Sequence, residues 1–245
     1  MKKPSFTTLI LLLLLWQMPV VHAESAASYK DLRDQMLKKG ADADKKKGSK
    51  FTAAERKLMK DSLAQAQQDH PSPGLKPGQK APDFMLNNAF GKPVSLSAQL
   101  KNGPVVLVFY RGAWCPFCNL HLHVLQKNID NFKKYGATLI AVTPQQPDQS
   151  VKQINKKGYP FEVLSDLDDS VMKQYGLYYK LSDDLVSLYK RKGLDVEQNN
   201  GKGRVALPIP GTFVIGQDRI IKAAHAEHDY KERMEPAEII QALQQ

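Results

Sequence analysis

Cys115 and Cys118 have the residue type and the spacing for thiol redox chemistry. They are the only cysteines in the 245-residue sequence, and they follow an apolar run at 105–110 and precede a segment with helical spacing that starts at Pro116. A strand that leads through Cys-x-x-Cys into a helix is the layout of a redox dithiol. The N–H groups and the dipole at a helix N-terminus favour the thiolate, which is the nucleophilic form of cysteine.

A structural disulfide and a metal site are the alternatives for these two cysteines. A disulfide that closes so short a loop stabilises a fold by only about 2 kcal/mol on the chain-entropy model, against about 3 kcal/mol for a loop of about fifteen residues. His121 and His123 extend the motif toward a metal site. Two helical residues with that spacing point about 200° apart, so at most one of them can join the cysteines. The spacing therefore favours the redox dithiol, and we predict no metal and no cofactor.

Residues 1–23 have the pattern of a secretory signal peptide. Lys2 and Lys3 form the basic start, 9–16 the apolar centre and 21–23 a small-residue cleavage site. The apolar stretch 9–21 would be about 20 Å long as a helix, whereas a bilayer core needs about 30 Å. We therefore expect a cleaved leader and a periplasmic or secreted protein without stable membrane anchoring, in a compartment where thiols can be oxidised.

The net charge of +10 raises the question of an acidic partner. The lysines are dispersed apart from short basic runs at 45–47 and 190–192, and no aromatic residues alternate with them as they do in nucleic-acid-binding modules. We predict a basic, solvated surface and no nucleic-acid partner.

Residues 24–75 are predicted to form a helical extension and a linker. Tyr29, Leu32 and Met36 recur at helical spacing, a break is expected at 40–48, and a second helix is expected at 51–68. Thr52 followed by Glu55 has the spacing of a capping box at the start of that second helix. The prolines and glycines of 71–78 then mark the boundary of the main domain, 76–245.

The main domain alternates strand and helix patterns after a short hairpin at 81–96. Strands are expected at 105–110, 138–142 and 161–164, and helices at 116–136, 148–157 and 168–175. This order predicts an α/β fold with a central mixed sheet and helices on both faces. Residues 177–206 interrupt the alternation with a helix at 183–190 and a mobile polar loop at 198–203, before a hairpin of strands at 208–215 and 220–224 and a last helix at 237–243.

Four motifs of this domain occur together in one known family. They are Phe109-Tyr110 through Cys118, the segments 159–166 and 175–177, and Gly211-Thr212-Phe213-Val214-Ile215. Over 76–244 the chain resembles the AhpC/TSA peroxiredoxin superfamily, and within it a peroxiredoxin-like bacterial branch with an Arg-Gly-x-Trp-Cys-Pro-x-Cys motif. The resemblance implies a thioredoxin-like fold and a thiol-dependent peroxidase for hydrogen peroxide or organic hydroperoxides. It also implies an external dithiol or a thioredoxin-like protein as electron donor.

The resemblance assigns roles to individual positions. Cys118 falls on the peroxide-reacting cysteine, and Cys115 falls on the family's threonine. Arg111 replaces a proline, and Pro210 replaces the family's second activating residue, an arginine. Cys118 would attack the peroxide and become a sulfenic acid, which Cys115 would convert to a disulfide, while Arg111 would supply positive charge.

Two other functions are open at this point. Trp114-Cys115-Pro116-x-Cys118 resembles the thioredoxin-type active site, in which Cys115 would attack a substrate disulfide, so a periplasmic thiol-disulfide oxidoreductase is the alternative. That resemblance also predicts a cis bond before Pro210. A metal-binding or redox-sensing module is the third possibility, with His225 and His228 near the dithiol.

Overall fold

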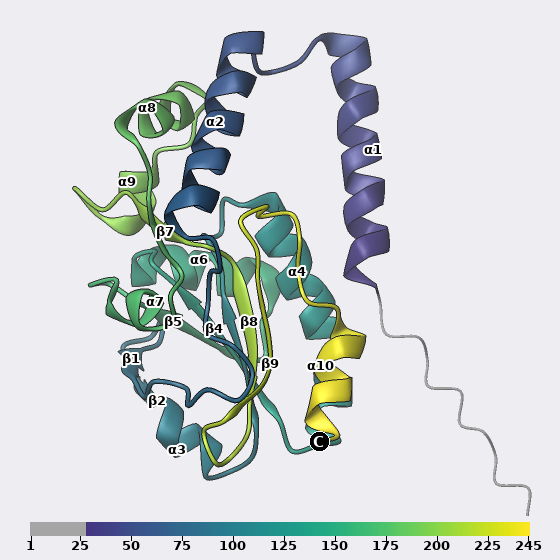
Figure 1. Ribbon diagram of the computed structural model, residues 1–245, viewed down its shortest axis with the longest axis vertical. Helices are drawn as coiled ribbons and strands as arrows, with labels where there is room; N and C mark the ends of the chain where they lie inside the picture. Colours follow the sequence, from purple (N-terminus) through teal and green to yellow (C-terminus); the bar gives the residue numbers. More distant parts are fainter. Residues whose placement is uncertain (1–27) are drawn as a thin grey trace, which may run out of the picture.

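The computed structural model describes residues 28–245, and a five-stranded mixed sheet forms its centre (Figure 1). The predicted leader, 1–23, lies outside the described residues. The strands of the sheet stand in the order β5 (Glu162–Ser165), β4 (Thr138–Thr143), β3 (Val105–Phe109), β8 (Gly211–Ile215) and β9 (Ile221–Ala226). The first three run parallel, and β8 and β9 pair antiparallel.

β3 is the central strand, and all five of its residues are buried. In its register, Val105 lies opposite Thr138 of β4 on one side and opposite Ile215 of β8 on the other. Alternate side chains point to opposite faces of the sheet, so Leu107 packs into one hydrophobic cluster and Val108 into another. A continuous apolar sequence is what such a two-sided strand requires.

Helices cover both faces of the sheet, as predicted (Figure 1). The first face is covered by α4 (Pro116–Lys127), α5 (Ile129–Lys133), α6 (Pro147–Lys157) and α10 (Pro236–Leu243), and the second by β1 (Met85–Asn87), β2 (Pro93–Ser95), α3 (Leu96–Leu100) and α7 (Ser170–Gln174). The helix predicted over 116–136 is divided at Asn128, whose side-chain amide donates to the carbonyl of Val124. The α/β class and the helices on both faces are confirmed.

The N-terminal extension is a hairpin of α1 (Tyr29–Lys47) and α2 (Ala53–Asp69), which projects beyond one end of the sheet (Figure 1). The capping box of Thr52 and Glu55 is present. The break predicted at 40–48 is wrong, because α1 continues through Gly40 and ends at Gly48, which has a φ of 79°. A single glycine costs a helix only about 1 kcal/mol, and good helix formers surround this one. Among residues 28–245, no helix is long and apolar enough to cross a membrane.

A small third cluster joins α2 to the segment that interrupts the alternation. It contains α8 (Asp183–Arg191), α9 (Val196–Asn200) and the two-stranded sheet of β6 (Tyr178–Lys180) and β7 (Ala206–Pro208). The mobile loop predicted at 198–203 is wrong for its first half, which belongs to α9. Asp195 caps that helix by accepting from the N–H of Gln198, and the buried Asn200 donates to the carbonyl of Ala206.

Candidate active site

The two cysteines lie where the end of β3 leads into α4. Cys115 is the N-cap of α4 and Cys118 is in its first turn, so their sulfurs face one another across the start of the helix. The two Sγ atoms are 2.6 Å apart, and the backbone N–H of Cys118 donates to Cys115 Sγ at 3.4 Å. Both are free thiols and both are buried, with exposed fractions of 1% and 0%. The pair is placed to form a disulfide after a small movement.

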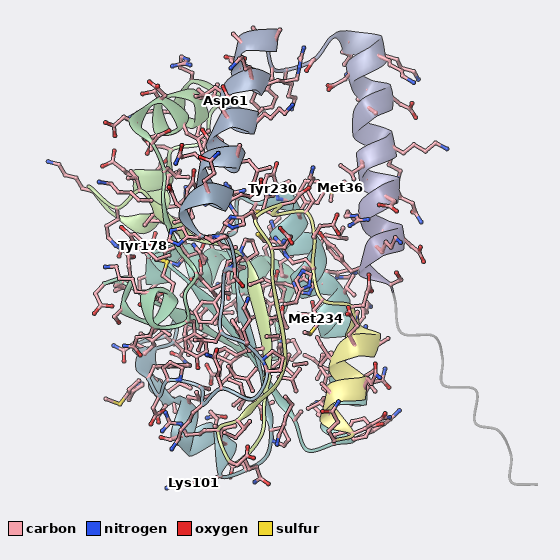
Figure 2. The ribbon with its side chains drawn as sticks, viewed as in Figure 1. Met36, Asp61, Lys101, Tyr178, Tyr230 and Met234 are labelled. Carbon is pink, nitrogen blue, oxygen red and sulfur yellow. The ribbon has the colours of Figure 1, made fainter. Side chains whose placement is uncertain are left out.

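A guanidinium group contacts Cys118 from a distant part of the chain. Arg233 is buried, and its Nη2 lies 3.5 Å from Cys118 Sγ. It belongs to the segment 227–235 that joins β9 to α10; Figure 2 shows Tyr230 of this segment at the end of the sheet nearest to α2, and Met234 at the start of α10. Arg233 could not be predicted from the sequence, because no motif or spacing relates it to a residue 115 positions away. The only signal is its position just before the Glu235-Pro236 start of a helix.

The two thiols differ in the direction in which their surroundings move the pKa. Burial raises the pKa of the Cys118 thiol, but the hydrogen bond with Cys115 and the positive charges of Arg233 and Arg111 outweigh burial and lower it to about 6. Burial and the neighbouring Cys118 raise the pKa of Cys115 well above its usual value. The backbone N–H donated to Cys115 acts in the opposite direction, but the partial charge of one N–H is weaker than two full guanidinium charges. The phenols of Tyr29, Tyr110 and Tyr159 also lie near Cys118.

Arg111 is held in a cage of aromatic rings. Its guanidinium carbon lies 4.9 Å from the ring centroid of Trp114 and 4.5 Å from that of Tyr230, and Nη2 donates to the hydroxyl of Tyr189 at 3.1 Å. Cation–π contacts and burial hold the group in place next to the thiols. The structure therefore brings all three predicted site residues together, with Arg111 acting on Cys118 through its charge.

A buried polar network holds the loop that precedes Cys115. The side-chain oxygen of Gln145 accepts from the N–H of Ala113 at 2.8 Å, and the Asn119 amide donates to the carbonyl of Ala113 at 2.6 Å. Gln153 donates to Asn119 and accepts from the hydroxyl of Tyr110. Because buried polar groups are costly unless they are paired, this network specifies one loop conformation.

A cavity of about 690 Å³ ends at the dithiol. Arg111, Cys115 and Pro210 line it together with Met59 and Leu63 of α2. Cys115 lines the cavity, whereas Cys118 is fully buried and does not line it. The sulfur that an incoming molecule meets first is therefore that of Cys115.

The structure bears on two predictions about residues near the dithiol: the cis bond before Pro210 and a metal site that includes histidines. The predicted cis bond before Pro210 is wrong: it is trans, in a segment where the N–H of Ile209 donates to the carbonyl of Leu177. Nε2 of His228 is hydrogen bonded to the carbonyl of His70, although His228 lines the cavity. His121 is buried against Tyr29, and burial lowers its pKa well below the usual value. Within 28–245 no three His, Cys, Asp or Glu side chains form a group that could hold a metal ion.

Comparison with known proteins supports the assignment of this fold to one family. Over 104 residues the chain is 33% identical to a putative peroxiredoxin of Mycobacterium tuberculosis and 31% identical to peroxiredoxin Bcp of Escherichia coli. Each alignment covers 42% of this chain and 66% of the relative. The crystal structure of peroxidoxin BcpB from Mycobacterium tuberculosis superposes with a TM-score of 0.55 and 22% identity, over 69% of this chain and 97% of that one.

The family match covers the elements that hold the two thiols. The AhpC/TSA family model matches residues 77–224, which is more than half of the chain and includes β3, the start of α4 and β8. The solved structure has the same fold as this chain, and the relatives are similar to this chain in sequence. On this basis, the chain belongs to the AhpC/TSA family.

Proposed function

We propose that this protein is a thiol-dependent peroxidase that reduces hydrogen peroxide or organic hydroperoxides through Cys118 and Cys115. The observation that carries the proposal is the stabilised thiolate of Cys118, which has a guanidinium at 3.5 Å and a second thiol sulfur at 2.6 Å. The peroxiredoxin names of the relatives support the same activity.

The first step is the attack of Cys118 on the peroxide. The thiolate attacks the terminal oxygen of the peroxide, and an S–O bond forms as the O–O bond breaks. Cys118 becomes a sulfenic acid, and the other peroxide oxygen leaves, takes a proton and departs as water or an alcohol. Arg233 and Arg111 stabilise the negative charge that moves from sulfur to the leaving oxygen. Because Cys118 is buried and Cys115 lines the cavity, the peroxide must pass Cys115 to reach Cys118.

The second step closes the disulfide. The sulfur of Cys115 displaces hydroxide from the sulfenic acid, the S–S bond forms, and the proton of the thiol completes the departing water. An external dithiol, such as a thioredoxin-like protein, returns two electrons by attacking Cys115, because Cys115 is the sulfur that borders the cavity. The proposal includes a periplasmic or secreted location, which rests on the pattern of residues 1–23.

The test is a single turnover of the pre-reduced protein, residues 24–245, with a stoichiometric hydroperoxide. Trp114 is the sole tryptophan of that segment, and its fluorescence and a free-thiol count report the reaction. We expect both thiols to disappear much faster than a free thiol would react. Cys118→Ser should abolish the reaction, whereas Cys115→Ser should stop at a sulfenic acid on Cys118, which dimedone traps.

The opposite outcome would identify the alternative function. If hydroperoxide acts slowly while a protein disulfide oxidises the dithiol quickly, the protein is a thiol-disulfide oxidoreductase. In that case Cys115→Ser would abolish the activity, because Cys115 is the sulfur that lines the cavity.

A further inference from the structure

The segment that carries Arg233 has little secondary structure of its own. Residues 227–235 join β9 to α10 as turns and irregular backbone. Within the segment, Arg233 Nη1 donates to the carbonyl of Glu232 at 2.6 Å. From α4, Nε2 of His121 lies 3.3 Å from the carbonyl of Met234. A long side chain on such a segment loses considerable conformational freedom when it is held against one atom. Contacts from outside the segment must therefore hold Arg233 at Cys118.

Besides His121 of α4, the first turn of α1 supplies these contacts. Tyr29 is 1% exposed, its hydroxyl donates to the carbonyl of Lys231 at 2.6 Å, and its ring meets His121 edge to face at 5.4 Å between centroids. The carboxylate of Glu235 accepts from the N–H of Tyr29 at 2.9 Å and from that of Lys30 at 2.7 Å. These bonds hold the segment on both sides of Arg233.

An ion pair adds a third contact. Arg33 of α1 pairs with Glu232, the residue that precedes Arg233, and the Arg33 side chain is only 11% exposed. The rest of α1 is mostly exposed beyond this first turn and the Arg33 contact. Tyr29, the one buried residue of this nineteen-residue helix, thus contacts both the segment that supplies the arginine and His121 of α4.

We infer that α1 is a positioning element of the active site: Tyr29, with Arg33, holds the segment 231–235 so that Arg233 remains in contact with Cys118. The inference rests on the proposed function for its catalytic meaning, since stabilising a thiolate matters to a peroxidase. It assigns a role to a helix that lies outside the 77–224 family match. Burial raises the pKa of Tyr29, and the nearby charges of Arg233 and Cys118 also act on it, which agrees with this proximity.

The test measures the thiolate directly. Tyr29→Ala removes the ring and the hydroxyl, and the first thiol titration of the reduced protein is followed by the ultraviolet absorbance of the thiolate. We expect the pKa of Cys118 to rise from about 6 toward the usual value of a cysteine, near 8.5. Such a rise lowers the fraction of thiolate at pH 7 by up to about 30-fold. Tyr29→Phe keeps the ring and loses one hydrogen bond, so its shift should be smaller.

Two further variants keep the result decisive. Arg33→Met removes one ion pair but keeps an unbranched apolar side chain, so it should raise the same pKa without unfolding the protein, even if Tyr29→Ala does not fold. Leu37→Ala is the control, because Leu37 is on α1 and 41% exposed, and it should leave the pKa unchanged. If Tyr29→Phe and Arg33→Met leave the pKa near 6 and lower only the melting temperature, α1 is a structural support and the inference is wrong.

The titration needs no peroxide, so it is independent of the proposed function. A raised pKa in a protein that fails to consume hydroperoxide would keep the positioning role and reject the peroxidase. An unchanged pKa in variants of an active peroxidase would reject the positioning role and keep the peroxidase.

Discussion

The two thiols and the arginine that contacts Cys118 come from regions that are built differently. The thiols lie in a continuous segment, 105–118, where β3 and α4 position them by backbone pairing and the buried network around Gln145 fixes the loop between. Arg233 lies in an irregular segment that is held by side chains of α1 and α4. The two thiols are thus positioned by local structure, whereas the guanidinium that contacts Cys118 is positioned by tertiary contacts.

Arginine substitutions test this comparison most strongly. We expect Arg233→Met to slow oxidation of the reduced protein at pH 7 by up to about 30-fold, because the Cys118 thiolate loses the charge that contacts it. Arg111→Met should have a smaller effect, since the guanidinium of Arg111 bonds to Tyr189 and acts on sulfur only through its charge. Stopped-flow Trp114 fluorescence with a stoichiometric hydroperoxide measures both rates.

The control is Arg191→Met, at an exposed position of α8, which should react as the wild type does. Equal losses for Arg233→Met and Arg111→Met would remove the distinction between the two regions. A larger loss of rate for Arg111→Met than for Arg233→Met would mean that the local segment 105–118 supplies both the thiols and the main positive charge on Cys118.

The pH dependence of oxidation sharpens the same comparison. The pKa of Cys118 is lowered in the folded protein, so the reactive thiolate is present at neutral pH and is lost as the pH falls through about 6. The rate of the first oxidation step should fall about tenfold for each pH unit below that point and stay level from pH 7 to pH 8. Rapid mixing across this range, on protein shown by circular dichroism to remain folded, measures the profile.

In Arg233→Met the whole profile should move to higher pH. A rate that still rises steadily between pH 7 and pH 9 in the wild type would mean that the thiol is not activated. Arg233 of the segment 227–235 would then make no contribution to the pKa of Cys118.

The cavity wall offers the smallest expected effect. Leu63 lines the cavity from α2, so Leu63→Trp should reduce the rate with a bulky hydroperoxide such as cumene hydroperoxide several-fold. The rate with hydrogen peroxide should not change, because a molecule of that size still passes. Competition between the two peroxides for the same reduced protein measures the ratio.

Ala64→Trp is the matched control, since Ala64 is the next residue of α2 and is exposed. It should leave both rates unchanged. A loss with hydrogen peroxide as large as the loss with cumene hydroperoxide would show that α2 supports the site without shaping access to it.

Much of the fold could be predicted because its signals are local. The alternating strand and helix patterns of 105–175, the Thr52–Glu55 capping box and the hairpin of β8 and β9 depend on residues close in sequence. The errors fall where tertiary contacts decide. Gly40 stays within a helix, residues 198–200 are ordered by the cap of α9 and by a bond to Ala206, and Pro210 follows a trans bond.

The sequence by itself determined that two thiols face one another, because Cys115 and Cys118 need only the end of a strand and the start of a helix to do so. It also identified Arg111, four residues before Cys115. Only the tertiary structure decided how Cys118 is charged and what reaches it, since Arg233, Tyr29 and the α2 wall come from distant parts of the chain. Electrostatic stabilisation and cavity shape depend on distances in space, and sequence spacing carries no record of them.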